Sequence, residues 1–173
     1  TENTIVVFSS DNGPWLVMED HGGSAGELRE GKQFTFDGGV RVPTVAMWKG
    51  KINPGTVEEN LATQMDWFPT FSKLAGIPLD KETVYDGRDL SQVLLGSGKR
   101  DGDSYLYYNG AKLEGFRQGE WKIKLPYEGN TGSDWRSTVA PHDTLLVNFG
   151  QSDREMENLL DQNNEMAFTL LSN

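Results

Sequence analysis

The sequence predicts an α/β fold, in which the end of a large parallel or mixed sheet is followed by a small antiparallel sheet with a packed helix. Three patterns carry this prediction. The run Ile5-Val6-Val7-Phe8 is continuous, apolar and rich in β-branched residues, as strands buried on both faces of a parallel sheet are. Beyond residue 100, short apolar segments alternate with Gly and Asn turns, which indicates an antiparallel meander. Residues 153–171 carry apolar side chains in loose helical spacing.

In the first half of the chain, the strand over residues 4–8 ends in Ser-Ser-Asp-Asn-Gly. Residues 13–39 follow, rich in Gly and polar groups and too long for a simple connector, which is typical of a functional loop. We expect a second strand over residues 40–48, with Pro43 at its start or on an edge.

Two helices are expected next. Residues 66–75 are followed by Gly76, a residue typical of helix C-caps, and residues 86–96 form a shorter helix that also ends in a glycine.

The second half is expected to hold short strands within residues 104–110, 113–127 and 143–149, and then a closing helix over 153–171, broken around Asn163. We therefore divide the protein into residues 1–76, the end of a catalytic α/β domain, and residues 77–173, a subdomain of antiparallel sheet and closing helix. The transition falls between residues 76 and 104.

Composition excludes several classes of function. The 173 residues include 16 basic and 26 acidic ones, a net charge of −10, which argues against non-specific binding of nucleic acid. There is no cysteine, so this chain contains no disulfide, thiolate zinc site or cysteine nucleophile. No apolar run approaches the roughly 18 residues that a membrane span needs.

Asp11 and Asn12 stand where open α/β folds bind ligands, beyond the carboxyl end of a strand. Carboxylate and amide oxygens are hard ligands that suit calcium or magnesium. Asp-Asn-Gly is also a common turn sequence, so a plain turn is an open alternative. Lys32, in a glycine-flanked loop, offers a compact positive charge for sulfate or phosphate, although most lysines are simply exposed.

Taken together, these segments resemble the carboxyl-terminal part of a type I sulfatase, of the alkaline-phosphatase superfamily. The resemblance covers nearly the whole chain and is weakest over residues 123–144. Its main motifs are "TIVVFSSDNG", "HGGSAGELREGKQFTFDGGVRVPTVAMWKGKI" and "MDWFPTFSKLAGIP". Three further segments fit family patterns: "DGRDLSQVLLG", "GFRQGEWKIK" and "LLVNFGQSDREMENL".

The resemblance implies hydrolysis of sulfate esters. Asp11 and Asn12 match the pair that ligates the family's catalytic calcium, and Lys32 matches the lysine that binds the sulfate group. His21 lies in the loop that lines the substrate pocket, although a loop histidine with no catalytic part is an alternative. Enzymes of this kind are secreted, periplasmic or lysosomal.

The sequence departs from the family at the nucleophile. Sulfatases of this type use a formylglycine made from Cys or Ser within "(C/S)-x-P-x-R", and neither Cys nor Ser-x-Pro-x-Arg occurs here. No catalytic residue is therefore assigned in this chain. The resemblance places the nucleophile, the remaining calcium ligands and the leaving-group acid in a missing amino-terminal part. Because calcium takes six to eight oxygens, we expect an incomplete calcium site and a piece that is inactive alone.

Two alternatives stay open. A related phosphoester or phosphonate hydrolase is the first, although zinc-dependent relatives have Asp-His where this chain has Asp11-Asn12. A non-catalytic binding or structural module derived from a sulfatase is the second, and such a module would compensate for lost sheet neighbours by forming a homodimer.

Overall fold

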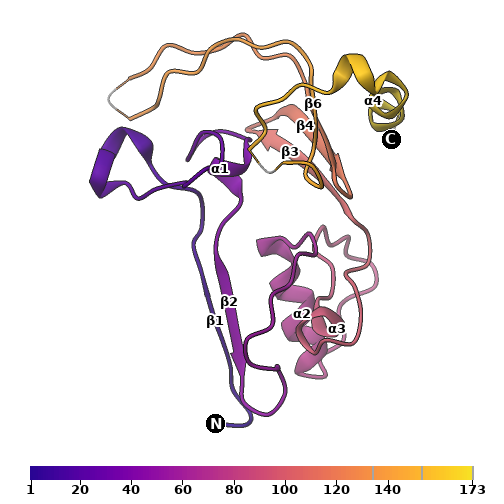
Figure 1. The fold of residues 1–173 in the computed structure, drawn as a ribbon. Helices are drawn as coiled ribbons and strands as arrows, with labels where there is room; N and C mark the ends of the chain where they lie inside the picture. Colours follow the sequence, from indigo (N-terminus) through magenta and orange to yellow (C-terminus); the bar gives the residue numbers. More distant parts are fainter. Residues whose placement is uncertain (134, 153, 173) are drawn as a thin grey trace. The chain divides into compact units, whose positions relative to one another are not determined.

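The computed structural model describes residues 1–133, 135–152 and 154–172 (Figure 1). Contacts divide the chain into two compact units, each built from two stretches of sequence. The first unit comprises Thr1–Ser9 and Pro43–Asp103, and the second comprises Ser10–Val42 and Ser104–Asn173. The domain division at residue 76 stays a prediction about the longer protein.

The first unit contains the predicted strand as β1 (Ile5–Ser9). It pairs antiparallel with β2 (Thr44–Trp48), in a two-stranded ribbon that Figure 1 shows side by side. The parallel neighbours that the apolar run led us to expect are not among the described residues, and Phe8 is 72% exposed, so burial of β1 on both faces stays a prediction about the longer protein. The apolar run predicted the strand correctly, but among the described residues only β2 adjoins it.

The helix expected at residues 66–75 is confirmed as α2 (Trp67–Leu74), preceded by the 3-10 turn η2 (Gln64–Asp66). The helix expected at residues 86–96 is reduced to the single turn α3 (Ser91–Leu94). It begins late because the Asp89 carboxylate accepts hydrogen bonds from the backbone N–H and the hydroxyl of Ser91, at 2.8 Å each, which holds the preceding residues in a turn.

Asp66 joins these elements. Its buried carboxylate accepts hydrogen bonds from the backbone N–H groups of Thr63 and Arg88, at 2.7 Å each. The Arg100 guanidinium adds two more, at 2.9 Å from Nε and 3.1 Å from Nη2. The first unit is thus held around a satisfied buried charge.

The second unit confirms the meander. Its four antiparallel strands lie in the order β3-β4-β5-β6, with Ile123 opposite Phe116 on one side and Leu146 on the other. The strands are β3 (Ser104–Asn109), β4 (Lys112–Gln118), β5 (Trp121–Lys124) and β6 (Leu145–Asn148).

The closing helix is shorter than expected. The 3-10 turn η3 (Leu160–Gln162) and α4 (Asn164–Leu171) form it, and the predicted break falls at Asn163. Residues 154–159 are irregular, and residue 153, the expected start, lies outside the described residues. They cannot join the helix because Leu159 donates its N–H to the Leu146 carbonyl on β6, at 2.8 Å.

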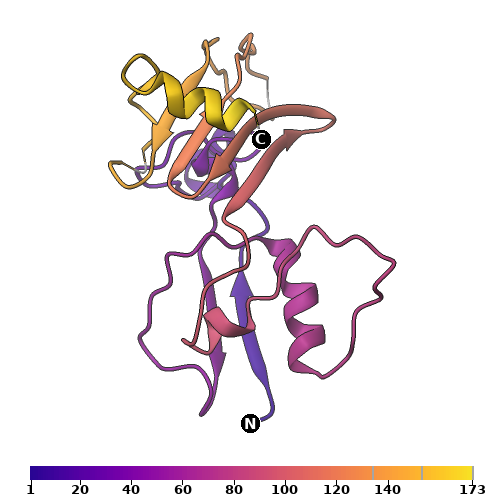
Figure 2. The same ribbon diagram turned by 90° about the vertical axis from the view of Figure 1, so that its right-hand side faces the viewer.

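The helix α4 covers the sheet (Figure 2). Ala167 and Leu170 pack on Ile123 and Leu146, which forms the apolar core of the second unit. No helix among the described residues combines the length and the apolarity that crossing a membrane requires.

The long loop in residues 10–42 contains the 3-10 segment η1 (Leu16–His21) and the single turn α1 (Asp37–Val40). The second strand therefore begins at Thr44, four residues later than predicted, because residues 37–40 form α1 instead.

Candidate functional site

The Asp11–Asn12 turn leaves its ligand oxygens free. The Ser10 hydroxyl donates to the Asn12 carbonyl at 2.9 Å, and the Asn12 side-chain amide donates to the Gly13 carbonyl at 3.0 Å. Within the described parts of the chain, neither the exposed Asp11 carboxylate nor the Asn12 side-chain oxygen accepts a hydrogen bond. These oxygens are therefore available to an external ligand.

Gly13 locks this turn onto α1. Its N–H donates to the Gly39 carbonyl at 2.9 Å, and a Cβ at residue 13 would lie 1.8 Å from the Gly38 oxygen. A Cβ at Gly38 would lie 2.1 Å from the Glu30 oxygen, and one at Gly39 would lie 2.1 Å from the Phe34 oxygen. The glycines of "DNG" and "DGG" are thus needed because the backbones meet without room for a side chain.

The same loop brings Lys32 beside this turn. Its backbone N–H donates to the Pro14 carbonyl at 2.8 Å, and its ammonium lies 5.3 Å from the centre of the Trp15 ring. None of the carboxylates that the structure describes forms an ion pair with the half-buried Lys32. Its charge is therefore available to an anion.

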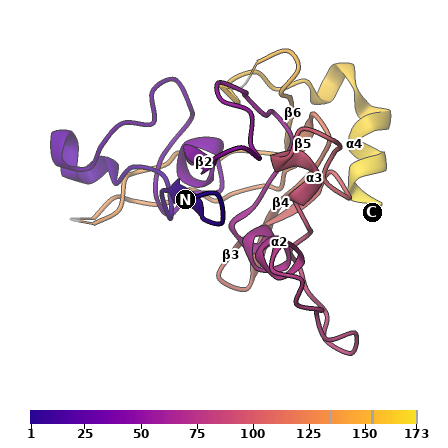
Figure 3. The same cartoon turned by 90° about the horizontal axis from the view of Figure 1, so that it is seen from below.

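Trp15 connects the loop to a distant part of the same unit. Its indole N–H donates to the Trp135 carbonyl at 2.8 Å. Figures 1 and 3 both show η1 close to the loop between β5 and β6. His21, the exposed last residue of η1, has no contact with Asp11, Asn12 or Lys32 among the described interactions.

The donor chemistry fits a hard cation, but the number of donors does not complete a site. Asp11 and Asn12 offer two oxygens of the kind calcium prefers, against the six to eight that it takes. No group of three or more His, Cys, Asp or Glu side chains within the described ranges is placed to hold a metal ion. Further ligands have to come from water, from substrate or from residues outside this chain.

A buried lysine on β5 lies beneath α1. The Lys122 ammonium is 3.0 Å from the Asp37 carboxylate and 2.7 Å from that of Glu155, and its side chain is 0% exposed. It also lies 4.0 Å from the centre of the Tyr107 ring. Burial by itself lowers the pKa of Lys122, but interactions with Tyr107, Glu155 and Asp37 outweigh it and raise the pKa, so the lysine stays charged.

Sequence reasoning missed this cluster, which we call the Lys122 cluster: Lys122, Asp37 and Glu155. A Lys-Ile-Lys strand is usually read as one with a polar face towards solvent, and the three residues are far apart in the chain. The available signal was that each lies in a different segment that resembles a sulfatase motif: "FDGGVRVP", "GFRQGEWKIK" and "SDREMENL".

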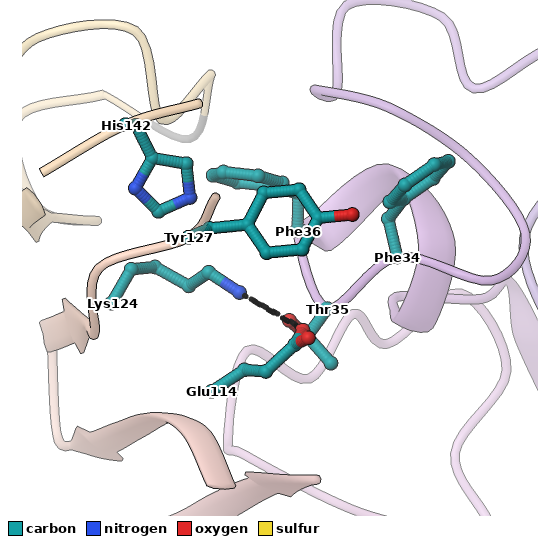
Figure 4. Close-up of a pocket in the computed structure, with 7 residues that line it drawn as sticks. All are labelled: Phe34, Thr35, Phe36, Glu114, Lys124, Tyr127 and His142. Atoms are coloured by element: carbon teal, nitrogen blue, oxygen red, sulfur yellow. Dashed lines mark hydrogen bonds and ion pairs between the residues drawn. The ribbon is translucent and has the colours of Figure 1, made fainter. Parts of the chain in front are cut away.

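Lys124 lies two residues after Lys122 on β5, so its side chain is on the same face of the strand and is also buried. It donates to the Thr35 hydroxyl and lies 3.8 Å from the Glu114 carboxylate, and Figure 4 shows its ammonium directed towards both. Burial lowers the pKa of Lys124 to about 8, to which the positive charge of Lys122 contributes.

A small cavity of about 10 Å³ lies beside Lys124. Aromatic rings form much of its wall, and burial lowers the pKa of the His142 ring beside it. A cavity of this size has room for about one water molecule at most, so it is not a substrate pocket. The lining residues are Phe34, Thr35, Phe36, Glu114, Lys124, Tyr127 and His142.

Comparison with known proteins identifies the family. Residues 1–77 match the sulfatase family model. Arylsulfatase A of Bos taurus is 38% identical over 178 residues, which is 95% of this chain and 35% of the relative. The human arylsulfatase A is 41% identical over 146 residues, covering 82% of this chain and 28% of the relative. N-acetylgalactosamine-6-sulfatase of Canis lupus familiaris is 38% identical over 140 residues, covering 80% and 27%.

Solved structures agree. The PsFucS1 sulfatase from Pseudoalteromonas sp. superposes with a TM-score of 0.78 at 26% identity, over 99% of this chain and 37% of that protein. A Bacteroides thetaiotaomicron protein, whose structure was solved in work on the metabolism of multiple glycosaminoglycans, has a TM-score of 0.82 at 23% identity. The superposition covers 99% of this chain and 38% of that protein. This second likeness concerns the fold alone.

The chain spans about a third of the length of these relatives. Over that length it has the alkaline-phosphatase-like α/β fold of its structural neighbours. Its matches to the family model, to arylsulfatase A and to a solved sulfatase lead to one conclusion: this chain belongs to the sulfatase family.

Proposed function

We propose that the protein containing this chain hydrolyses sulfate esters, with Asp11 and Asn12 as two ligands of a calcium ion and Lys32 binding the sulfate group. One observation supports this assignment above the others. Backbone hydrogen bonds tie the residues just after Asn12 both to Lys32 and to α1, so free oxygen ligands and a free ammonium share one loop.

The chemistry of the assignment is electrostatic. A bound calcium ion supplies positive charge to the anionic oxygens of a sulfate ester. Lys32 adds a second positive charge, and the neighbouring Trp15 ring shields one side of that ammonium from water. His21, in the same loop, is a further substrate contact in this proposal.

The nucleophile and the other calcium ligands belong outside the 173 residues. A formylglycine precursor motif does not occur in this sequence, so we expect the 173-residue chain by itself to be inactive. The relatives named above include arylsulfatases and a sugar sulfatase, so aryl and sugar sulfates are both candidate substrates. We expect a secreted, periplasmic or lysosomal location for the whole protein.

The test compares substrates and variants in the whole protein. We expect turnover of an aryl sulfate, and Asp11→Ala and Lys32→Ala should each lower kcat/KM by about 100-fold or more, as loss of a group that stabilises developing charge does. Lys49→Ala, at an exposed lysine, is the matched control and should leave kcat/KM unchanged.

Other outcomes select the alternatives. Preference for an aryl phosphate over the aryl sulfate would identify a phosphoester hydrolase. Absence of turnover of either ester by the whole protein would favour a non-catalytic module. Turnover of the aryl sulfate by the pure 173-residue chain would contradict the assignment of the nucleophile to residues outside it.

A further inference from the structure

We propose that Lys122 is a positioning residue for the Asp11–Asn12 turn. By pairing with Asp37 and Glu155, it fixes α1, and the backbone of α1 in turn holds Gly13 next to Asn12. The functional consequence, that calcium binding depends on Lys122, rests on the proposed function, whereas the positioning itself does not.

The first step is the anchor. Lys122 is fully buried on β5, in the hydrogen-bonded sheet, and its ammonium contacts one carboxylate from α1 and one from the irregular 154–159 segment. One positive charge between two negative ones is stable only while all three remain together, because a buried charge without a partner is costly. The sheet thereby fixes the position of Asp37.

The second step leads from Asp37 to the turn. The backbone N–H of Asp37 donates to the Glu155 carboxylate, and Asp37 is the first residue of α1. Gly38 and Gly39 come next, and it is their carbonyls that Gly13 contacts. Because the Gly13 N–H is bonded to the Gly39 carbonyl at 2.9 Å, a shift of α1 has to move Gly13 or break this hydrogen bond.

A second connection holds the same loop. The Arg29 guanidinium donates to the Glu155 carbonyl at 2.9 Å, while the Arg29 carbonyl accepts from the Gly38 N–H at 2.8 Å. Glu155 adopts a φ of +53°, in the left-handed region that is unfavourable for a residue with a side chain. The Lys122 cluster therefore links the sheet, α1 and the 154–159 segment.

The decisive experiment measures hydrogen exchange of the Gly13 amide in the 173-residue chain. Lys122→Met keeps the length of the side chain and removes its charge. We expect the Gly13 amide to exchange at least about 10-fold faster relative to the Ala167 amide, which donates to the Asn163 carbonyl within α4 and serves as the internal reference. A merely stabilising lysine would speed both amides equally, and an unchanged ratio in the folded variant would overturn the proposal.

Two further variants keep the test decisive. Arg100→Met breaks a buried ion pair in the first unit, and we expect it to leave the Gly13 to Ala167 ratio unchanged. Glu155→Gln retains an acceptor for the Asp37 N–H while removing one charge, and should raise the ratio less than Lys122→Met does. If Lys122→Met does not fold, Glu155→Gln decides: an unchanged ratio there overturns the proposal.

Calorimetric titration of the whole protein with calcium separates this inference from the proposed function, because the ligands outside this chain are then present. Weaker calcium binding by the Lys122→Met whole protein than by the unmodified whole protein, by about 10-fold or more, supports both. A whole protein that binds no calcium contradicts the proposed calcium site, and the exchange ratio of Gly13 still decides whether Lys122 positions the turn.

Discussion

The two sheets of this molecule treat their apolar side chains in opposite ways. In the β1–β2 ribbon, Phe8 is 72% exposed and Val45 64% exposed. In the β3–β6 sheet, Leu146 is fully buried and Ile123 nearly so, beneath α4. The sequence of β1 is typical of a buried strand, but among the described residues no layer covers the ribbon. The second sheet carries its own cover.

This difference shows that the two units are stabilised by different interactions. A two-stranded ribbon is marginal in water by itself, and in the first unit the buried Asp66 and its four donors hold the segments that carry α2 and α3. The second unit combines an apolar core with the buried charges of the Lys122 cluster. Substitutions at these positions should therefore affect the units unequally.

The largest effect is expected at Asp66. Asp66→Ala removes the acceptor of two backbone N–H groups and leaves the buried Arg100 without its partner, so the free energy of unfolding of the first unit should fall by about 3–5 kcal/mol. Urea unfolding followed by NMR signals of α2 measures it. Asp80→Ala, at an exposed turn, is the matched control and should lower the free energy of unfolding far less than Asp66→Ala does. Equal losses in the two variants would contradict the central part assigned to Asp66.

A large effect is also expected in the core of the second unit. Leu146→Ala should lower the free energy of unfolding by about 2–5 kcal/mol, because it removes apolar contacts and leaves a cavity beneath α4. Leu171→Ala, at a position 58% exposed on α4, should change the free energy of unfolding by no more than about 0.5 kcal/mol. Urea unfolding followed on β5 and β6 signals compares the two, and similar losses would show that α4 is not the cover of this sheet.

An intermediate, pH-dependent effect is expected at Lys124. Its pKa is about 8 in the folded chain, against a usual value of 10.5. Between these pH values the unfolded chain binds more protons, so the free energy of unfolding should rise with pH. Relative to Lys124→Met, the rise from about pH 8 to about pH 10 should be on the order of 2 kcal/mol.

The comparison with Lys124→Met is needed because burial raises the pKa of Tyr107 above its usual 10.0, and interactions with its neighbours raise the pKa of Lys122 above its usual 10.5. Subtracting the curve of the variant removes the pH dependence that these two groups contribute. Urea unfolding at several pH values provides the measurement. A wild-type curve that runs parallel to that of the variant would show that Lys124 keeps an ordinary pKa despite its burial.

The smallest effect is expected on the exposed ribbon. Val45→Thr replaces a methyl group by a hydroxyl on a side chain that already faces water, so the free energy of unfolding of the first unit should change by no more than about 0.5 kcal/mol. Urea unfolding checks this value. A loss above about 1 kcal/mol would mean that Val45 is covered in solution, for example in a homodimer, and sedimentation analysis would then identify the dimer.

Local patterns predicted the parts of this fold that local interactions form. The strand at Ile5, the helix α2 before Gly76, the meander after residue 100 and the break at Asn163 all follow from spacing and turn chemistry within a few residues. The family resemblance added the sulfatase assignment, which the comparisons bear out. The roles of Asp11, Asn12, Lys32 and His21 stay predictions.

What the sequence by itself determined was therefore the family, most element positions and the segment that carries the candidate site. Tertiary structure alone decided that β1 pairs antiparallel, that Leu159 bonds to β6 instead of joining the helix, and that Lys122 meets Asp37 and Glu155. The physical reason is distance along the chain. Each of these arrangements depends on partners 30 or more residues apart, or, for Leu159, on a backbone hydrogen bond to the strand β6. A local pattern carries no information about such partners.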